Sequence, residues 1–310
     1  MLITLINTLL PVFLIIVLGW LLYRFGFLSA GALHEINRLT YWIGVPCLLF
    51  QKIATAEQQT EGAGAILLVV LLTTAIGIAL AYLLAFRLRL PSRSVGTFVQ
   101  GLFRGNLAFV GLPVVLYAFA GPANSAIQSA AVLALGPMVV VYNVAAVLVL
   151  IISRESLQRQ MLKRLLNGLI TNPLLAACLL GVLYSYLALP LPQVADRTLG
   201  AIGQMALPLA LLCIGGTLAA VRVSRAGLVQ STLAAAGKTL LLPLIGGLIA
   251  WLAGLDQDTT RIALIMLACP TASASYILAR QLGGDEVLAS GTIFISVLLS
   301  APALAIVMLL

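Results

Sequence analysis

Two basic side chains lie deep inside apolar segments of the sequence. Arg104 follows about ten residues after the start of an apolar stretch near Ser94, which is roughly 15 Å along a helix. Lys238 has a comparable depth in a stretch that begins near Ala226. A cation near the centre of a membrane costs at least a few kcal/mol and usually faces an interior cavity. We therefore predict that both side chains face such a cavity, with snorkelling to the membrane surface as the alternative.

No acidic residue offers these cations an obvious counterion. All nine acids fall in predicted loops or at the ends of apolar stretches: Glu35, Glu57, Glu61, Glu155, Asp196, Asp256, Asp258, Asp285 and Glu286. An anionic solute could supply the missing charge. The single histidine, His34, is in a predicted loop, so proton coupling through a buried carboxylate or histidine is not expected. Sodium held by Asn side chains and unwound carbonyls remains an alternative.

Two apolar segments contain residues that disfavour a continuous helix. The first runs from Arg104 to Pro113 and includes Gly105, Asn106 and Gly111. The second begins at Cys269 and contains these helix-breaking or hydroxyl residues: Pro270, Thr271, Ser273 and Ser275. Broken helices expose backbone groups that hydrocarbon cannot satisfy, and converging helix N-termini favour an anion. We predict a shared binding site; close helix packing, as in Gly101-x-x-x-Gly105, is the alternative.

Three further polar residues lie within apolar segments. Tyr142 and Asn143 are in the fifth segment, and Asn172 directly precedes Pro173 in the sixth. Each could line a cavity or form hydrogen bonds between helices. We expect a cavity position for Asn143 and a packing role for Asn172.

Composition identifies the class of protein. Hydrophobic residues make up 62% of the chain and charged residues 8%, with a mean hydropathy of +1.15. Soluble domains are about half apolar and a quarter charged. The pattern predicts an all-α integral membrane protein bound to the lipid bilayer. The first segment, from about Leu5 to Tyr23, lacks the features of a cleaved signal peptide and is expected to be retained.

Ten apolar segments are long enough to be candidate membrane spans. Their approximate starts are Leu5, Ile36, Gly64, Ser94, Ser125, Asn167, Val194, Ala226, Thr259 and Val287. Prolines and glycines recur with a constant spacing of 162 residues in the pairs Pro11/Pro173, Gly19/Gly181 and Pro46/Pro208, and Pro137/Pro302 recurs at 165. We predict a five-helix repeat over residues 1–152, a linker over 153–166 and a second, inverted five-helix repeat over 167–310. Paired proline breaks in two halves are typical of membrane carriers.

The distribution of Lys and Arg predicts the orientation. One set of loops carries twelve cations: Arg24, Arg38, Arg87, Arg89, Arg93, Arg154, Arg159, Lys163, Arg164, Arg222, Arg225 and Arg280. The opposite set carries Lys52, Arg197 and Arg261. This asymmetry predicts that the first set is cytoplasmic and that both termini are outside the plasma membrane. The net charge of +8 thus indicates topology, and no soluble domain offers a nucleic-acid surface.

The cysteines do not predict a disulfide, a metal site or a cofactor. Cys47, Cys178, Cys213 and Cys269 all lie within apolar segments, with no metal-binding spacing. No His-Glu-x-x-His motif or other hydrolytic arrangement is present, so an enzyme is not expected.

Several of these residues resemble the auxin efflux carrier family. Asn106, Gly111 and Pro113 resemble that family's Asn-x-x-x-x-Gly-x-Pro motif. Pro270, Ala279 before the turn at 280–285, and Pro302 with Ser300 in the last segment are similar to its C-terminal pattern. The resemblance covers essentially the whole chain.

The resemblance implies a bacterial-type member of the bile, arsenite and riboflavin transporter-like superfamily. Such a protein has ten helices in a 5+5 inverted repeat, and its broken helices 4 and 9 cross at the substrate site near the membrane midplane. It works as an elevator-type secondary transporter of small organic anions such as auxin, malonate or malate. A sodium-coupled symporter of the bile acid type and a passive anion channel are the alternatives, and a homodimer is left open. The sodium-binding acids of the bile acid symporters have no visible counterpart here.

Overall fold

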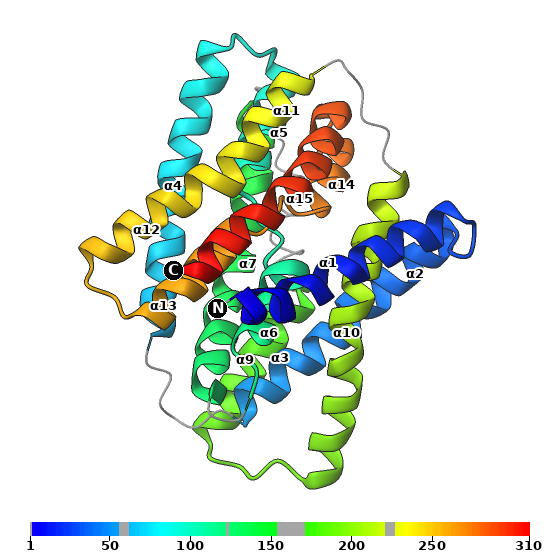
Figure 1. The fold of residues 1–310 in the computed structure, drawn as a ribbon, viewed down its shortest axis with the longest axis vertical. Helices are drawn as coiled ribbons and strands as arrows, with labels where there is room; N and C mark the ends of the chain where they lie inside the picture. Colours follow the sequence, from blue (N-terminus) through cyan, green and yellow to red (C-terminus); the bar gives the residue numbers. More distant parts are fainter. Residues whose placement is uncertain (1, 56–61, 122–123, 154–170, 221–226) are drawn as a thin grey trace. The chain divides into compact units, whose positions relative to one another are not determined.

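The computed structural model describes residues 2–55, 62–121, 124–153, 171–220 and 227–310 (Figure 1). Within these ranges the chain forms helices and no β-strand, and an isolated antiparallel bridge joins Gly105 to Thr271. This confirms the prediction of an all-α protein. The predicted linker beyond Ser153 and the expected segment starts at Asn167 and Ala226 lie outside the described residues.

Five helices run without interruption over more than 20 residues: α1 Leu2–Arg24, α4 Ala63–Arg87, α7 Ser125–Ile152, α10 Gln193–Ala220 and α15 Glu286–Leu309. The remaining segments are shorter helices: α2 Ala30–Leu39, α3 Val45–Ala54, α5 Ser92–Phe103, α6 Leu112–Ala118, α9 Pro173–Tyr186, α11 Leu228–Ala236, α12 Leu242–Leu252, α13 Gln257–Ala268 and α14 Ala274–Gln281. Three π-helical turns complete the described helices: η1 Thr40–Gly44, η2 Leu107–Gly111 and η4 Gly237–Leu241.

Six helical runs among the described residues are long and apolar enough to cross a membrane. They are Asn7–Arg24, Ala63–Arg87, Ser125–Ile152, Gln193–Ala220, Leu228–Leu252 and Glu286–Leu309. Several such runs indicate a multi-pass membrane protein. The arrangement of ten spans as two inverted repeats stays a prediction.

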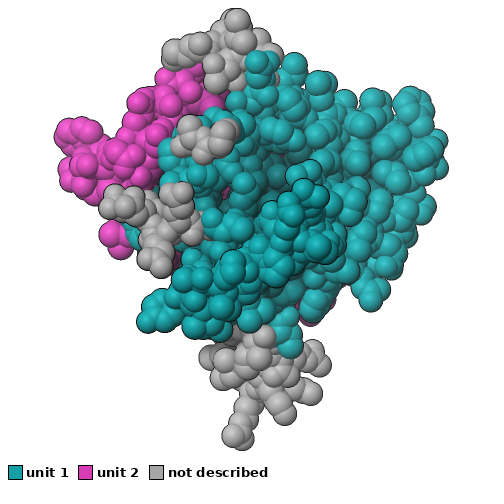
Figure 2. Space-filling view, turned by 90° about the horizontal axis from the view of Figure 1, so that it is seen from below, with its two compact units in different colours: residues 1–66, 108–139, 168–220 teal, residues 67–107, 140–167, 221–310 magenta. Residues whose placement is uncertain are grey.

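The chain divides into two compact units (Figure 2). Unit 1 comprises Met1–Ile66, Ala108–Val139 and Gly168–Ala220, and unit 2 comprises Leu67–Leu107, Val140–Asn167 and Val221–Leu310. Each unit therefore draws segments from both halves of the sequence. The predicted repeat boundaries concern similarity between those halves and not packing, so they stay a prediction.

Unit 1 is organised around two helix pairs, α1 with α10 and α3 with α9. Glycines allow close approach in both pairs. A Cβ added at Gly19 of α1 would lie 2.2 Å from the Leu212 carbonyl oxygen, and one at Gly181 of α9 would lie 2.9 Å from Ile53 Cβ. Thus α1 and α9, the first helices of the two sequence halves, each pack on a helix from the other half. The repeated glycines Gly19 and Gly181 lie at these contacts.

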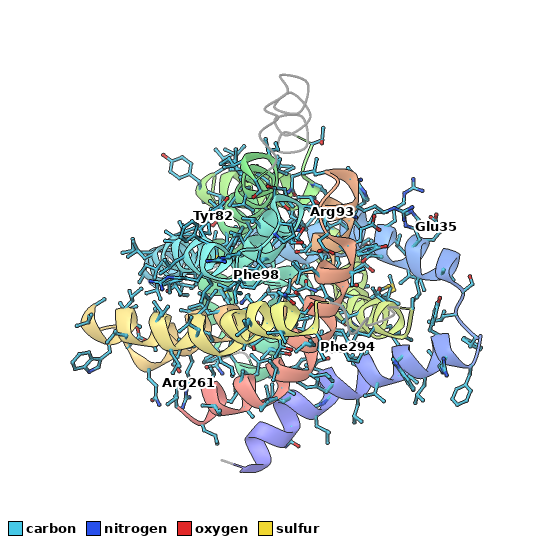
Figure 3. The ribbon with its side chains drawn as sticks, turned by 90° about the horizontal axis from the view of Figure 1, so that it is seen from above. Glu35, Tyr82, Arg93, Phe98, Arg261 and Phe294 are labelled. Atoms are coloured by element: carbon cyan, nitrogen blue, oxygen red, sulfur yellow. The ribbon has the colours of Figure 1, made fainter. Side chains whose placement is uncertain are left out.

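Unit 2 buries α5 among α11, α14 and α15. Phe98, in the middle of α5, is fully buried (Figure 3). The start of α5 is held to the loop before α15: Arg93 Nε donates to the Gly284 carbonyl at 3.0 Å, and Ser94 Oγ donates to Asp285 Oδ2 at 2.7 Å. Polar contacts at one end and apolar packing along its length fix the position of α5.

From the sequence we expect the repeated prolines to break helices, but four of them do not. Pro11, Pro137, Pro208 and Pro302 all lie inside continuous helices. A proline removes one backbone hydrogen bond, and neighbouring groups in membrane helices compensate for that loss. Pro173 instead begins α9, where its missing N–H costs nothing, and Asn172 caps the same helix by accepting from the Leu174 and Leu175 amides. Asn172 is buried and its Oδ1 caps its own helix, so its packing role between helices stays a prediction.

Three other prolines directly follow the π-helical turns. Pro46, Pro113 and Pro243 are each the second residue of the α-helix after η1, η2 and η4. In η1 and η4 the residue before the proline donates its N–H five positions back, to Thr40 and Gly237 respectively. The wider turn makes room for the proline ring, which would otherwise clash with a carbonyl of the preceding turn.

Asp256 caps the start of α13, and this contact gives a testable stability effect. Hydrogen bonds from the side chain and the backbone amide of Thr259 lower the pKa of the Asp256 carboxyl below its ordinary value. Asp256→Ala is expected to lower the free energy of unfolding by about 1 kcal/mol at neutral pH. Because the folded-state pKa is depressed, this contribution is present above the ordinary Asp pKa of about 4 and is lost as the pH falls through the lowered value.

Thermal unfolding of the wild type, Asp256→Ala and Asp256→Asn between pH 7 and pH 3 would measure this effect. Asn keeps an acceptor for the Thr259 amide and is expected to retain most of the stability without the pH dependence. Equal melting temperatures for wild type and Asp256→Ala at pH 7 would contradict the capping role.

Candidate functional site

Two helices of unit 2 end where the sequence predicts interruptions. α5 ends at Phe103, and Arg104 is extended, with φ −78° and ψ 90°. α13 ends at Ala268, and Cys269 is extended, with φ −61° and ψ 150°. The residue before a proline disfavours the helical conformation, which explains the end of α13 before Pro270. Helix resumes at Leu107 after the first interruption and at Ala274 after the second.

The two interrupted segments pair with each other through their backbones. The Asn106 N–H donates to the Pro270 carbonyl at 2.7 Å, and the Ala272 N–H donates to the Arg104 carbonyl at 2.9 Å. Between these bonds Gly105 and Thr271 form the antiparallel bridge. Backbone groups that a helix end would leave unsatisfied in a membrane protein therefore find partners here.

Neighbouring helices hold this pairing from two sides. Thr271 Oγ1 donates to the Gly101 carbonyl of α5 at 2.8 Å. The Thr271 N–H donates to Ser296 Oγ of α15 at 3.0 Å, and the same hydroxyl donates to the Ile293 carbonyl. All of these residues belong to unit 2, so the paired interruption is fixed inside one compact unit.

Arg104 is buried, with 5% of its surface exposed. Its Nη2 donates to Asn143 Oδ1 of α7 at 2.6 Å. The neighbouring Tyr142 is also buried, packs edge-on against Phe103 with ring centroids 5.8 Å apart, and has its hydroxyl 3.2 Å from Thr74 Oγ1. Asn143 is thus part of a hydrogen bond between helices that orients Arg104.

Lys238 is fully buried in the π-helical turn η4. Its amine donates to the Leu267 carbonyl, in the last turn of α13. The C-terminal end of a helix carries partial negative charge and stabilises a cation, so a main-chain group does the work of a counterion. With Arg104 and Lys238 both buried, the alternative that they snorkel to the surface does not describe this structure.

Gly105, within the paired segments, lies directly against Lys238 and Cys269. A Cβ added there would lie 2.9 Å from Cys269 Sγ, 2.9 Å from Lys238 Cε and 3.2 Å from Lys238 Nζ. Only glycine fits at this position without displacement of these buried groups. The structure thus brings Arg104, Gly105, Lys238 and Pro270 into one part of unit 2.

The remaining predicted site residues are distributed as follows. Thr271 and Asn106 take part in the paired interruption, Ser273 precedes α14 without a capping hydrogen bond, and Ser275 lies buried in the first turn of that helix. Gly111 and Pro113 belong to unit 1, where Gly111 ends η2 and Pro113 is buried at the start of α6.

Residue-by-residue reading of the sequence missed Gln100 and Ser296. Gln100 is fully buried on α5 and its Nε2 donates to the Ser275 carbonyl at 3.0 Å. For Gln100 the available signal was a glutamine within an apolar helix. For Ser296 the signal was a hydroxyl at every fourth position of α15, at Thr292, Ser296 and Ser300.

Comparison with known proteins adds independent information. Residues 4–308 match the profile of a family described as "Membrane transport protein". The chain belongs to this family. The resemblance to the auxin efflux carriers is thereby confirmed, and the chain is a membrane transporter by family. This chain is 25% identical over 301 residues to an "Uncharacterized transporter" of Methanothermobacter thermautotrophicus strain Delta H. The aligned region covers 96% of this chain and 95% of that protein.

All four cysteines of the family member are free, and Cys178, Cys213 and Cys269 are buried. Among the described residues no group of three or more His, Cys, Asp or Glu side chains could hold a metal ion.

Proposed function

We propose that this family member is a secondary transporter of small organic anions, such as mono- or dicarboxylates or auxin-like acids, and has no enzymatic activity. The supporting observation is the burial of two cations, Arg104 and Lys238, beside one pair of interrupted helices. Arg104 donates to the Asn143 side chain and Lys238 to a main-chain carbonyl, and the two buried cations both contribute positive potential to this region. An anionic group that enters this region gains charge-assisted hydrogen bonds.

Alternating access by an elevator-type movement belongs to the same proposal. The backbone pairing, Arg104 and Lys238 all lie in unit 2. This unit can therefore carry a bound anion without breaking the hydrogen bonds that form the site. We further propose the plasma membrane as the location, with the loops rich in Lys and Arg in the cytoplasm, both termini outside and the broken helices crossing at mid-depth.

Two rival functions differ in measurable ways. A sodium-coupled symporter would lose uptake when sodium is replaced by choline, and a passive channel would conduct without saturation or counterflow. We propose sodium-independent transport, because Lys238 already provides a fixed cation at the C-terminal end of α13.

Purified protein in liposomes, tested with labelled mono- and dicarboxylates, would examine the proposal. Arg104→Ala is expected to lower kcat/KM for the preferred anion at least tenfold, since a hydrogen bond to a charged group contributes about 1.5–3 kcal/mol. Lys238→Met, which keeps the chain length without the charge, is expected to have a similar effect.

Arg38→Ala is the matched control, because Arg38 is exposed and pairs with Glu35 at 3.5 Å on the surface of α2. Its uptake should equal that of the wild type. Saturable uptake that neither Arg104→Ala nor Lys238→Met alters would rule out anion binding by these cations.

A further inference from the structure

Two buried oxygen atoms next to the paired interruption lack hydrogen-bond partners within the described part of the chain. They are Gln100 Oε1 and Ser275 Oγ, on residues that are 0% and 1% exposed. Buried polar atoms are nearly always satisfied in folded proteins, because an unmade hydrogen bond there is costly. Two such atoms, on residues joined by a hydrogen bond, are candidates for contact with a bound ligand.

The position of the two atoms follows from one hydrogen bond. Gln100 Nε2 donates to the backbone carbonyl of Ser275 at 3.0 Å. A carbonyl accepts and cannot donate, so the nitrogen of the Gln100 amide must face it, and the amide oxygen must be the atom left over. The unsatisfied oxygen of Gln100 therefore belongs to a side chain that is hydrogen-bonded to Ser275, the residue with the unsatisfied hydroxyl.

The chemistry of these atoms restricts what they can bind. Gln100 Oε1 can only accept a hydrogen bond, so an ionised carboxylate, which also only accepts, cannot satisfy it. A hydroxyl group can satisfy both atoms at once, since its O–H donates to Gln100 Oε1 while its oxygen accepts from the Ser275 O–H.

The two atoms are also in reach of the proposed anion site. Gln100 lies in the last turn of α5, and its backbone carbonyl accepts from the Arg104 N–H at 2.9 Å, so the two residues are neighbours at the end of this helix. Ser275 lies in the first turn after the second interruption. A small molecule with a carboxylate at Arg104 would bring a neighbouring hydroxyl to Gln100.

We propose that Gln100 and Ser275 form a subsite for a hydroxyl group, so that the preferred substrates are hydroxycarboxylates. This inference rests on the proposed transport of organic anions and specifies their class. A site that hydrogen-bonds a substrate hydroxyl discriminates strongly against the analogue that lacks it, because its own buried groups then stay unpaired.

The test compares pairs of anions that differ by one hydroxyl: lactate with propionate, and malate with succinate. In proteoliposomes the wild type is expected to favour the hydroxylated member of at least one pair by tenfold or more in kcat/KM. Gln100→Leu and Ser275→Ala are each expected to bring this ratio close to one. The ratio is measured within one variant, so differences in the amount of folded protein cancel.

Thr97→Val is the matched control. Thr97 is buried on the same helix, one turn before Gln100, but its hydroxyl is used by the Asp285 N–H at 3.0 Å. The ratio should be unchanged in this variant. As a readout independent of transport, lactate or malate should raise the melting temperature of the wild type more than its partner does, and Gln100→Leu should remove the difference.

The outcomes separate the two proposals. If the wild type transports none of the four anions and none alters its melting temperature, the anion proposal itself fails. If it transports anions without preference for the hydroxylated ones, or if Gln100→Leu keeps the preference, the subsite is wrong and a buried water satisfies these atoms instead.

Discussion

Replacing Gly105 with valine is expected to abolish anion uptake. The first carbon of any side chain at this position would lie 2.9 Å from both Cys269 Sγ and Lys238 Cε, closer than van der Waals contact permits. Lys238 is fully buried and its amine is bonded to the Leu267 carbonyl, so displacing it would break that hydrogen bond. Valine must therefore displace Lys238 or separate the two interrupted segments.

Initial uptake rates in proteoliposomes would measure this loss, with Gly105→Ala expected to show an intermediate defect. Gly247→Ala is the control in the same unit, because the nearest atom to its added Cβ is a Leu264 methyl at 3.8 Å, an ordinary contact. Wild-type uptake by Gly105→Val would mean that Lys238 and the paired segments take no part in transport.

Gly215→Val is expected to prevent stable folding of unit 1. A Cβ at Gly215 of α10 would lie 1.8 Å from the Ile16 carbonyl oxygen and 2.7 Å from the Trp20 nitrogen, both backbone atoms of α1. A flexible side chain can turn away, but a helical backbone cannot, so α1 and α10 would have to separate along their contact. Overpacking typically costs about 1–3 kcal/mol and more where rigid backbones must separate, which is a large part of the stability of a typical protein.

Detergent-solubilised Gly215→Val should aggregate or elute without a monodisperse peak, and any folded fraction should melt well below the wild type. Gly64→Ala is a suitable comparison, since no atom lies within 4 Å of the added Cβ. A wild-type melting temperature for Gly215→Val would show that the close approach of α1 and α10 is not required.

The ends of α5 and α13 can be expected from the sequence because their causes are local. Gly105 and Pro270 disfavour helix through their own backbone preferences, and α5 and α13 end at Phe103 and Ala268. What each interruption pairs with is a long-range property. Nothing in the residues around Asn106 indicates that its N–H bonds to the Pro270 carbonyl, which is more than 160 residues away.

The partner of Lys238 shows a second limit of sequence reasoning. A search for acidic side chains near Lys238 finds none, because the partner is the Leu267 main-chain carbonyl at the end of α13. Every residue has such a group, so residue identity gives no signal. The prediction of helix breaks at the prolines was wrong for the opposite reason. Pro11 and Pro208 carry a strong local signal, yet the helices around them are continuous.

The link between Arg104 and Ala272, and that between Asn106 and Pro270, use main-chain atoms alone. Apart from Gly105, where an added side chain would displace buried neighbours, exchanging a side chain next to these bonds removes none of the bonding atoms. Under the proposed function, substitutions on α5, α7 and α14 would change which anion is bound, while the paired interruption keeps its shape. The same paired interruption is a practical starting point for engineering transporters with altered selectivity.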